Sequence, residues 1–336
     1  MAALDCLERA RLLVEPALEA AVDRLCPDLR LPARYHFGWD EHNGSPAGVG
    51  AGKGLRPTLA LLSAEAVGAP AEVGVPGAVA VELVHNFSLV HDDVVDGDTE
   101  RRHRLTVWAA FGTDEALIAG DALHTLAFQI LLAEADPPRV AAARRLVSAT
   151  TAMIAGQAAD MALDDQSVVT LEDCLAMEAA KTGALLGYAA SVGAVLADAD
   201  PATVDALDSY GRQLGLAYQA VDDVLGIWGE PEVTGKPTGN DLRQRKKSMP
   251  VAVVLSAGGT AAADLDAVYG RRGALDDDEL ARAAAIIESA GGREATLAEA
   301  GRRLEAALVS LEGVELDSRA LRELEEVARF VVERDA

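Results

Sequence analysis

The stretch that decides the fold runs from Val79 to Arg104 and reads VAVELVHNFSLVHDDVVDGDTERRHR. Its apolar residues recur at steps of three and four, which predicts an amphipathic helix. Four polar residues share one stripe of this helix, namely Glu82, His85, Asp92 and Asp96. The stretch therefore predicts a long helix that is apolar along most of its length and carries acids at its end.

The acidic end of this helix needs a positive partner. Gly97 is a typical helix stop, so Asp92, Asp93 and Asp96 lie where the helix dipole already presents partial negative charge. Carboxylates this close also repel one another. Mg²⁺ prefers oxygen ligands and is often coordinated by substrate phosphates as well as by carboxylates. The pattern therefore predicts a divalent cation site.

Length and composition favour one large helical protein. The chain has 336 residues, of which 50% are hydrophobic and only 4% aromatic. This composition supports a sizeable core and favours helices over strands. No stretch alternates with period two, so the sequence predicts an all-α bundle that forms a single domain over residues 1–336. Residues 26–52 are rich in Pro, Gly and His, and we expect them to form a loop.

Charge, cysteines and hydropathy narrow the partners and the compartment. The formal net charge of −24 should repel nucleic acid. No uninterrupted apolar run reaches the length of about 18 residues that a membrane span needs, so no transmembrane segment is expected. Cys6, Cys26 and Cys174 lack CxxC or metal-ligand spacing, and the N-terminus lacks a secretory signal. The sequence therefore predicts a cytoplasmic location.

A second acidic site echoes the first. Gln219, Asp222, Asp223 and Gly226 are spaced i, i+3, i+4 and i+7, which places them on one face of another predicted helix. One Asp pair at a helix end is also compatible with a solvated surface. Two such pairs, each embedded in apolar helix, are harder to interpret as surface. Two facing helices of this kind would place carboxylates on both sides of one cavity.

Basic residues recur beside the glycine-rich segments. The set comprises Lys53, Arg56, Arg101, Arg102, Lys181, Lys236, Arg245, Lys246 and Lys247. Alone, each would be an ordinary solvated surface charge. Arg offers a planar fork to phosphate oxygens and Lys a compact charge. Together, acids that favour Mg²⁺ and bases that favour phosphate indicate a diphosphate substrate.

Taken in order, these motifs resemble those of the trans-isoprenyl diphosphate synthases, also called polyprenyl synthetases. DDVVD at 92–96 resembles the first aspartate-rich motif of that family. The other matching segments are GKGLRP at 52–57, HNFSLVHDD at 85–93, GD at 120–121, GQAAD at 156–160, KT at 181–182, YQAVDD at 218–223 and GKPTGNDLRQRKKSMP at 235–250. The resemblance implies an isoprenoid-synthase-type helical bundle around a central active-site cavity, and a homodimer.

The resemblance also implies residue roles. Three Mg²⁺ ions are expected, with Asp92 and Asp96 binding two and Asp222 the third. The residues expected to contact the allylic diphosphate are Arg101, Lys181, Lys236 and Lys246, the last by its alignment with a family lysine. Those expected to hold isopentenyl diphosphate are Lys53, Arg56, His85 and Arg102. Thr182 and Gln219 are expected to line the carbocation.

The implied reaction has three steps. The allylic diphosphate ionises, the double bond of isopentenyl diphosphate attacks the cation, and a proton is eliminated. Metals and bases would stabilise the departing diphosphate, where charge develops. A dry cavity must protect the cation from water.

Two segments depart from the family pattern. The second motif is commonly DDxxD, but Gly226 stands at its last position, so weaker or altered binding of the third metal is expected. The family segment DLxxGKxT reads DLRQRKKS here, with Arg245 in place of Gly and Ser248 in place of Thr. Lys246 matches the family lysine, and Lys247 is an alternative for its role.

Product length is expected to depend on the residues four and five before the first Asp, which are Ser88 and Phe87. In this family, a small residue four positions before the first Asp, an aromatic residue five positions before it and no insertion in the motif are typical of enzymes that make geranylgeranyl diphosphate. A farnesyl or a longer-chain product is the alternative.

Two other functions compete with this interpretation. A terpene cyclase on the same fold would ionise an allylic diphosphate but would not use the isopentenyl diphosphate residues. A non-catalytic regulatory subunit would carry damaged acidic motifs, and Gly226 is one such departure. The intact first motif favours the synthase.

Overall fold

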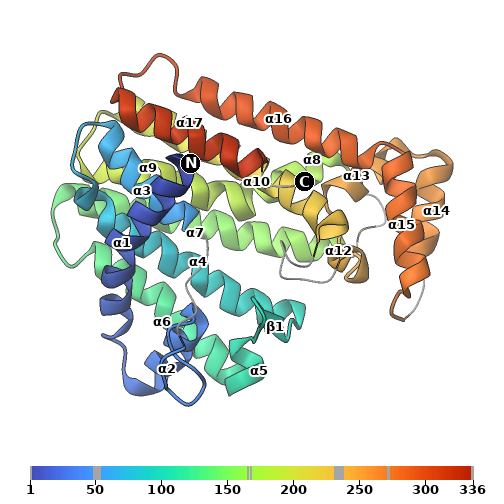
Figure 1. Cartoon of the computed structure of the whole chain (residues 1–336), viewed down its shortest axis with the longest axis horizontal. Helices are drawn as coiled ribbons and strands as arrows, with labels where there is room; N and C mark the ends of the chain where they lie inside the picture. The colour runs from blue at the N-terminus through green and yellow to red at the C-terminus, as the bar shows by residue number, and fades with distance from the viewer. Residues whose placement is uncertain are drawn as a thin grey trace. The chain divides into compact units, whose positions relative to one another are not determined.

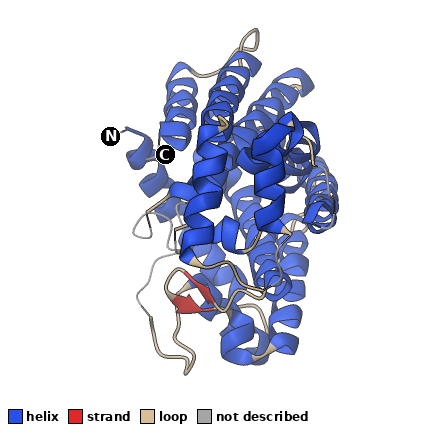
Figure 2. Ribbon diagram, turned by 90° about the vertical axis from the view of Figure 1, so that its right-hand side faces the viewer, coloured by secondary structure: helices blue, strands red, loops and turns tan. Residues whose placement is uncertain are grey.

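The computed structural model describes residues 2–47, 54–164, 166, 169–230, 238–270 and 273–333. It is 79% helical and 2% strand, which confirms the all-α prediction. Figure 2 shows one short hairpin among helices. By contacts between Cα atoms the chain divides into two compact units, each assembled from three segments. The prediction of a single domain stays a prediction.

Unit 1 comprises Met1–Thr150, Gly187–Asp208 and Leu311–Val327 (Figure 1). Its elements are α1 (Ala2–Val22), α2 (Pro27–Phe37), α3 (Leu55–Ala66), the 3₁₀ turn η1 (Ala71–Gly74), α4 (Val75–Asp96), β1 (Glu100–Arg101), β2 (Arg104–Leu105), α5 (Val107–Phe111) and α6 (Thr113–Leu131), with most of α9 (Ala184–Leu196) and α17 (Ser318–Glu333) and parts of α7 (Pro137–Asp164) and α10 (Pro201–Trp228).

The core of unit 1 is built around α4, the helix predicted from Val79–Arg104. Pro76 lies in its first turn, and Gly97 ends it in the left-handed conformation with φ of 68°. Leu83 of α4 and Leu123 of α6 are fully buried. A Cβ atom on Gly193 of α9 would lie 2.1 Å from a backbone oxygen of α3, so these helices pack with their backbones close together.

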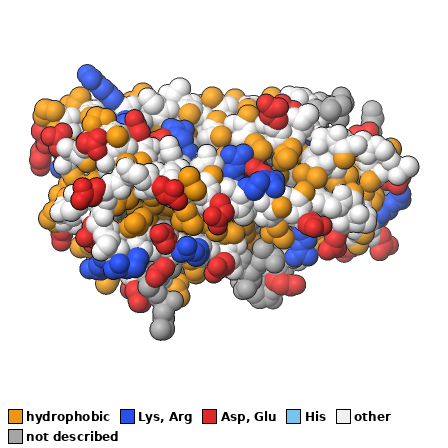
Figure 3. Space-filling view, turned by 90° about the horizontal axis from the view of Figure 1, so that it is seen from above, with side chains coloured by type: hydrophobic (Ala, Val, Ile, Leu, Met, Phe, Trp, Pro, Cys, Tyr) orange, Lys and Arg blue, Asp and Glu red, His pale blue; other side chains and the backbone are white. Residues whose placement is uncertain are grey.

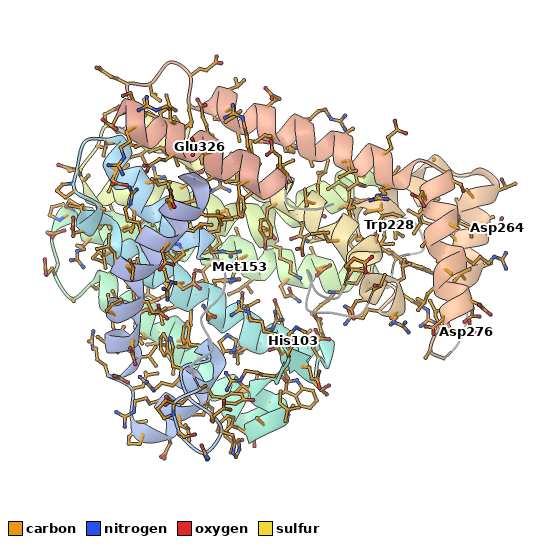
Figure 4. All side chains as sticks on the ribbon, in the orientation of Figure 1. His103, Met153, Trp228, Asp264, Asp276 and Glu326 are labelled. Atoms are coloured by element: carbon orange, nitrogen blue, oxygen red, sulfur yellow. The ribbon has the colours of Figure 1, made fainter. Side chains whose placement is uncertain are left out.

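Unit 2 comprises Thr151–Leu186, Ser209–Ser310 and Ala328–Ala336. Its elements are the end of α7, α8 (Leu171–Glu178), the π-helical turn η2 (Ala179–Gly183), most of α10, α12 (Asn240–Arg243), α13 (Met249–Ala257), α14 (Gly259–Tyr269), α15 (Asp277–Ser289) and α16 (Gly292–Ser310). One apolar cluster joins Ile227, Leu242, Val251 and Leu265. The ring centroid of Trp228, which is labelled in Figure 4, lies 5.3 Å from the guanidinium carbon of Arg293.

Two expectations from the sequence were wrong in detail. Residues 26–52 are not all loop, because α2 occupies Pro27–Phe37. The sequence showed no strand, whereas β1 and β2 form a two-stranded antiparallel sheet.

Two helical stretches, Ala71–Asp96 and Leu171–Leu196, are long and apolar enough to cross a membrane by length and composition alone. Of their apolar windows, 61% and 78% are buried in the protein, as in the core helices of globular proteins. They are therefore weak evidence for a membrane span. Acidic side chains lie scattered over the face drawn in Figure 3, among apolar and basic ones.

Candidate active site

At the acidic end of α4, the two adjacent aspartates have different surroundings. Asp92 is partly exposed and Asp96 is exposed, one helical turn apart on one face. Asp93 is 1% exposed and accepts hydrogen bonds from Nε and Nη2 of Arg101, both at 2.8 Å. Successive helix residues point about 100° apart, and the packing of α4 leaves Asp92 partly exposed while it turns Asp93 inward. Asp92 and Asp96 are thus the outward carboxylates, and Asp93 is a structural anchor.

The hairpin that follows α4 carries the basic residues of unit 1. Arg102 and His103 form its turn with positive φ angles of 53° and 61° (His103 is labelled in Figure 4). Arg104 donates from Nη1 to the carbonyl oxygen of Tyr35 at 3.1 Å and from Nη2 to that of Asp40 at 2.9 Å. The hydroxyl of Tyr35 donates to the carbonyl oxygen of Leu105 at 2.9 Å. These bonds fix the hairpin against α2.

Three predicted anion-binding residues, Arg56, His85 and Arg102, form one electrostatic group. Burial lowers the pKa of His85 well below its usual value, and the charges of Arg56 and Arg102 lower it further. A neutral imidazole among guanidinium groups offers a donor to an anion, and the carboxyl group of Glu82 lies in the field of the same two arginines, whose charges oppose the rise in its pKa caused by burial. The structure thus supports an anion site here, and Lys53 lies outside the described residues.

Two neighbours of this group were not predicted from the sequence. The ring Nε2 of His36 lies 3.0 Å from Oδ1 of Asn86, and the amide nitrogen of Asn86 donates to Oε1 of Glu82 at 3.0 Å. A pocket in unit 1 is lined by His36, Arg101, Arg102 and residues of the hairpin and α2. The loop interpretation of residues 26–52 concealed the contribution of His36.

His36 provides a test of this electrostatic setting. Burial, then the charges of Arg101 and Arg102, lower its pKa to about 3. The folded protein keeps His36 neutral, whereas the unfolded chain protonates it below about pH 6.5. Because the folded pKa is the lower one, stability is lost as the pH falls, by about 1.4 kcal/mol per pH unit below pH 6.5.

The matched variant is His36→Gln. Between pH 7 and pH 5 the unfolding free energy of the natural protein should fall by about 2 kcal/mol more than that of the variant, as measured by urea unfolding. The acids of the chain contribute equally to both proteins, so their effect cancels. Equal pH dependence of the two proteins would mean that His36 titrates normally in the fold.

The two predicted chain-length residues lie below Asp92 on α4. Phe87 is 8% exposed, and its ring centroid lies 4.8 Å from those of both His91 and His124. Ser88 is partly exposed, and its hydroxyl donates to the carbonyl oxygen of His85 at 2.8 Å. The aromatic ring is therefore held between α4 and α6, while the position four before Asp92 carries only a small side chain.

In unit 2, a π-helical turn presents Lys181 and Thr182 between α8 and α9. Such turns are rare and occur often at functional sites. Nζ of Lys181 lies 2.5 Å from Oδ2 of Asp160, the last residue of GQAAD. A Cβ atom on Gly156, one turn earlier, would lie 2.3 Å from the backbone nitrogen of Lys181. The motif thus shapes α7 to receive this turn and to orient its lysine.

A network of hydrogen bonds joins this turn to α10. Thr182 Oγ1 donates to Gln219 Oε1 at 3.1 Å, and Gln219 Nε2 donates to Asp223 Oδ1 at 2.9 Å. Asp223 Oδ2 accepts from the backbone N–H of Met249 at 2.8 Å, and Glu178 hydrogen bonds the same carboxylate. The predicted pair Thr182 and Gln219 is therefore brought together, with the amide oxygen of Gln219 turned toward Thr182.

Glu178 is the member of this hydrogen-bond network that the sequence did not predict. It is 2% exposed, and burial raises its pKa well above the usual range, with the nearby charge of Asp223 adding to the effect. Burial also raises the pKa of Asp223, but the donors from Met249 and Gln219 oppose the rise. Glu178 is therefore the protonated partner and Asp223 the ionised one. The i, i+4 spacing of Glu178 and Thr182 was the available signal.

In the second acidic motif, as in the first, the two adjacent aspartates differ in exposure. Asp222 is exposed, whereas Asp223 is 5% exposed and bonded inside unit 2. Among the residues that the structure describes, no group of three His, Cys, Asp or Glu side chains is placed to hold a metal ion. Pairs of outward carboxylates still fit Mg²⁺, which takes one or two carboxylates and completes its shell with water and substrate phosphates.

The two candidate lysines after α12 differ in their surroundings. Lys247 donates from Nζ to the carbonyl oxygen of Leu163 at 3.1 Å and also to that of Gln166, so it binds carbonyl groups at the end of α7. Lys246 is partly exposed, and its backbone N–H donates to the carbonyl oxygen of Asp241 at 2.9 Å. Lys236 lies outside the described residues.

Known proteins resemble this chain along nearly all of its length. The family model described as polyprenyl synthetase matches residues 47–287. A (2E,6E)-farnesyl diphosphate synthase of Mycobacterium bovis is 46% identical over 337 residues, covering 99% of this chain and 94% of its own. A geranylgeranyl diphosphate synthase of Mycobacterium tuberculosis is 43% identical over 306 residues, covering 91% and 87%. A solved polyprenyl synthetase from Streptomyces coelicolor A3(2) has a TM-score of 0.94 at 50% identity, covering 97% of this chain and 98% of that one.

Proposed function

We propose that this chain, which belongs to the polyprenyl synthetase family, is an Mg²⁺-dependent synthase of a short all-trans prenyl diphosphate. One observation carries the proposal: in unit 1 the outward carboxylates of Asp92 and Asp96 are followed directly by a hairpin whose arginines, with Arg56, surround neutral His85. A metal site and a separate anion site in one unit are what a transferase with two diphosphate substrates requires.

Two Mg²⁺ ions would be held by Asp92 and Asp96 of unit 1, and a third by Asp222 of unit 2. Members of this family use Mg²⁺ with their diphosphate substrates. When bound, the ion would neutralise the developing charge of the departing diphosphate. The outward placement of the three aspartates, against the buried Asp93 and Asp223, supports this assignment. A count of three ions per active site is part of the proposal.

The side chains of this chain would perform the remaining tasks. Arg101, Lys181, Lys236 and Lys246 would bind the allylic diphosphate, and Lys53, Arg56, His85 and Arg102 would bind isopentenyl diphosphate. Thr182 and Gln219 would place oxygen atoms beside the allylic cation as it forms, an orientation that the bond from Gln219 to Asp223 supports. The released diphosphate would accept the proton lost in the elimination, so no side-chain base is needed.

We propose geranylgeranyl diphosphate as the product. The small side chain of Ser88 would leave room for the growing chain one turn below Asp92, and the packed ring of Phe87 would form the floor of that pocket. Farnesyl diphosphate is the second candidate, because the relative from Mycobacterium bovis bears the name of a farnesyl diphosphate synthase.

A product assay tests the proposed function. Purified protein would receive Mg²⁺, isopentenyl diphosphate and, separately, dimethylallyl, geranyl and farnesyl diphosphates, with product length measured by mass spectrometry. Elongation that stops at twenty carbons is expected. A stop at fifteen would favour the farnesyl alternative. Hydrocarbon released from the allylic substrate alone would indicate a terpene cyclase, and no reaction would favour a regulatory subunit.

Product length should respond to the two residues below Asp92 in opposite directions. Ser88→Phe adds a ring in the proposed tail pocket, so the main product should become shorter. Phe87→Ala removes the floor and should make it longer. The same mass-spectrometric assay measures both, and Phe128→Ala is the control because Phe128 contacts His124 rather than the ring of Phe87. An unchanged product in both variants would remove these residues from the pocket.

We also propose that the protein is a cytoplasmic homodimer that binds no nucleic acid. The family resemblance supports the dimer, and the net charge of −24 argues against nucleic acid. Analytical ultracentrifugation at micromolar concentration would test the dimer. Sedimentation of the monomer alone would contradict it.

A further inference from the structure

Glu178 is a buried acid that lies directly before the π-helical turn and faces a second buried acid. It ends α8, three residues before Lys181 and four before Thr182, and is 2% exposed. Its side chain hydrogen bonds the carboxylate of Asp223, which is 5% exposed. Two ionised carboxylates offer only acceptors, so this bond requires that one of the two acids carries a proton.

The partners of the two acids show which one carries the proton. Asp223 accepts from Nε2 of Gln219 at 2.9 Å through Oδ1 and from the backbone N–H of Met249 at 2.8 Å through Oδ2. Within the described part of the chain, Oε2 of Glu178 is buried and has no hydrogen-bond partner. A buried charge without a partner costs far more free energy than the carbonyl oxygen of a neutral acid. Glu178 is therefore the donor of the bond that joins the two acids.

The donors to Asp223 come from different elements and together fix the plane of its carboxylate. Gln219 lies on the same helix, α10, whereas Glu178 approaches from α8 and the N–H of Met249 from α13. An ionised carboxylate can only accept, so Gln219 must turn its NH₂ group toward Asp223. The amide oxygen of Gln219 then faces the hydroxyl of Thr182, 3.1 Å away. Removal of the donor at Glu178 would free the carboxylate to rotate, and the amide with it.

We propose that Glu178 is a positioning residue for prenyl transfer. Its hydrogen bond to Asp223 holds the amide oxygen of Gln219 toward the allylic cation. This inference rests on the proposed function. The oxygen carries partial negative charge and would stabilise the cation as it forms, whereas an NH₂ group in its place would oppose it. Because Glu178 acts only on this step, its loss should lower kcat and leave KM for isopentenyl diphosphate unchanged.

The test removes the donor in two ways and restores it in a third. Glu178→Met has a similar volume and no donor, and Glu178→Asp withdraws the carboxyl group by one methylene. Glu178→Gln keeps the length of the side chain and an N–H donor for Asp223. Steady-state kinetics at saturating geranyl diphosphate would give kcat and KM for isopentenyl diphosphate, and thermal melting without substrate checks folding. The same measurements on Gln219→Met, with and without Glu178→Met, complete a double-mutant cycle.

Glu178→Met and Glu178→Asp should each lower kcat at least about ten-fold, while Glu178→Gln should stay within about three-fold of the natural protein. KM for isopentenyl diphosphate should change by less than about two-fold in all three. In the Gln219→Met background, Glu178→Met should lower kcat by less than about two-fold more, because the amide that it positions is absent. Natural kcat in Glu178→Met or Glu178→Asp, an equal loss in Glu178→Gln, or a full loss in the Gln219→Met background would overturn the inference.

Failure of the proposed function would look different. Absence of elongation by the natural protein would contradict that function and this inference with it. Elongation by the natural protein, together with natural kcat in Glu178→Met, would contradict the inference alone.

Discussion

Replacing Asp92 with alanine is expected to lower kcat/KM for prenyl transfer by at least about 10³-fold, because a carboxylate ligand of a catalytic metal contributes several kcal/mol to stabilising the transition state. Asp92 lies partly exposed on the outward face of α4, one turn from Asp96. The fold should lose little, since Asp92 contributes no buried side chain. Steady-state kinetics with isopentenyl and farnesyl diphosphates, together with urea unfolding, would measure both effects.

Asp93 is the matched control, adjacent in sequence but different in role. Asp93→Ala removes the buried partner of Arg101, and we expect the unfolding free energy to fall by about 2 kcal/mol. The hairpin would loosen, so activity should fall less than in Asp92→Ala, and stability more. Full activity in Asp92→Ala would exclude it as a metal ligand and would remove the main support for the assignment.

Much of the fold could be predicted because α4 carries its own start and stop. Pro76, the apolar periodicity and Gly97 give both ends of the helix from local chemistry alone. The capping box of Thr170 and Asp173 likewise begins α8 through local chemistry. The family resemblance, drawn from the order of short motifs, is confirmed by the match over residues 47–287.

The failures come from tertiary contacts that leave no local pattern. The Pro, Gly and His content of residues 26–52 favours a loop, yet Pro27 begins α2 and Gly38 caps it in the left-handed conformation. Arg34 of α2 pairs with Glu19, Asp23 and Asp40, contacts that the sequence does not reveal. The hairpin strands are two residues long, too short for alternation to be visible.

The site was predicted as a list of residues rather than as an arrangement. Periodicity indicates that neighbouring aspartates point apart, but only packing decides that Asp93 and Asp223 face inward. The sequence marked Gly226 as a departure, and it could not show that the side chain of Asp241 lies against that position. Partners brought from distant segments are the information that a single sequence lacks.

The second large effect is expected at Gly156, which touches no substrate in the proposed mechanism. In Gly156→Ala the new methyl group would meet the backbone nitrogen of Lys181 at 2.3 Å and its Cα at 2.7 Å. Backbone atoms cannot move aside as a flexible side chain can, so α7 and the π-helical turn must separate. Overpacking of this kind costs about 1–3 kcal/mol of stability.

The larger loss should be in catalysis. Lys181 would move relative to the substrate, and a displacement of about 1 Å in a positioning group can lower the rate about 10²-fold. Asp160→Asn, which weakens the ion pair with Lys181 without adding volume, should reduce activity less and leave stability nearly unchanged. Gly301→Ala on α16 is the volume control: no atom lies within 4 Å of its new Cβ, and we expect it to gain about 0.5–1 kcal/mol. Urea unfolding and kcat/KM measured on the three variants separate the two effects. Because the clash is with the backbone of the turn itself, natural kcat/KM in Gly156→Ala would mean that the position of Lys181 does not limit the reaction.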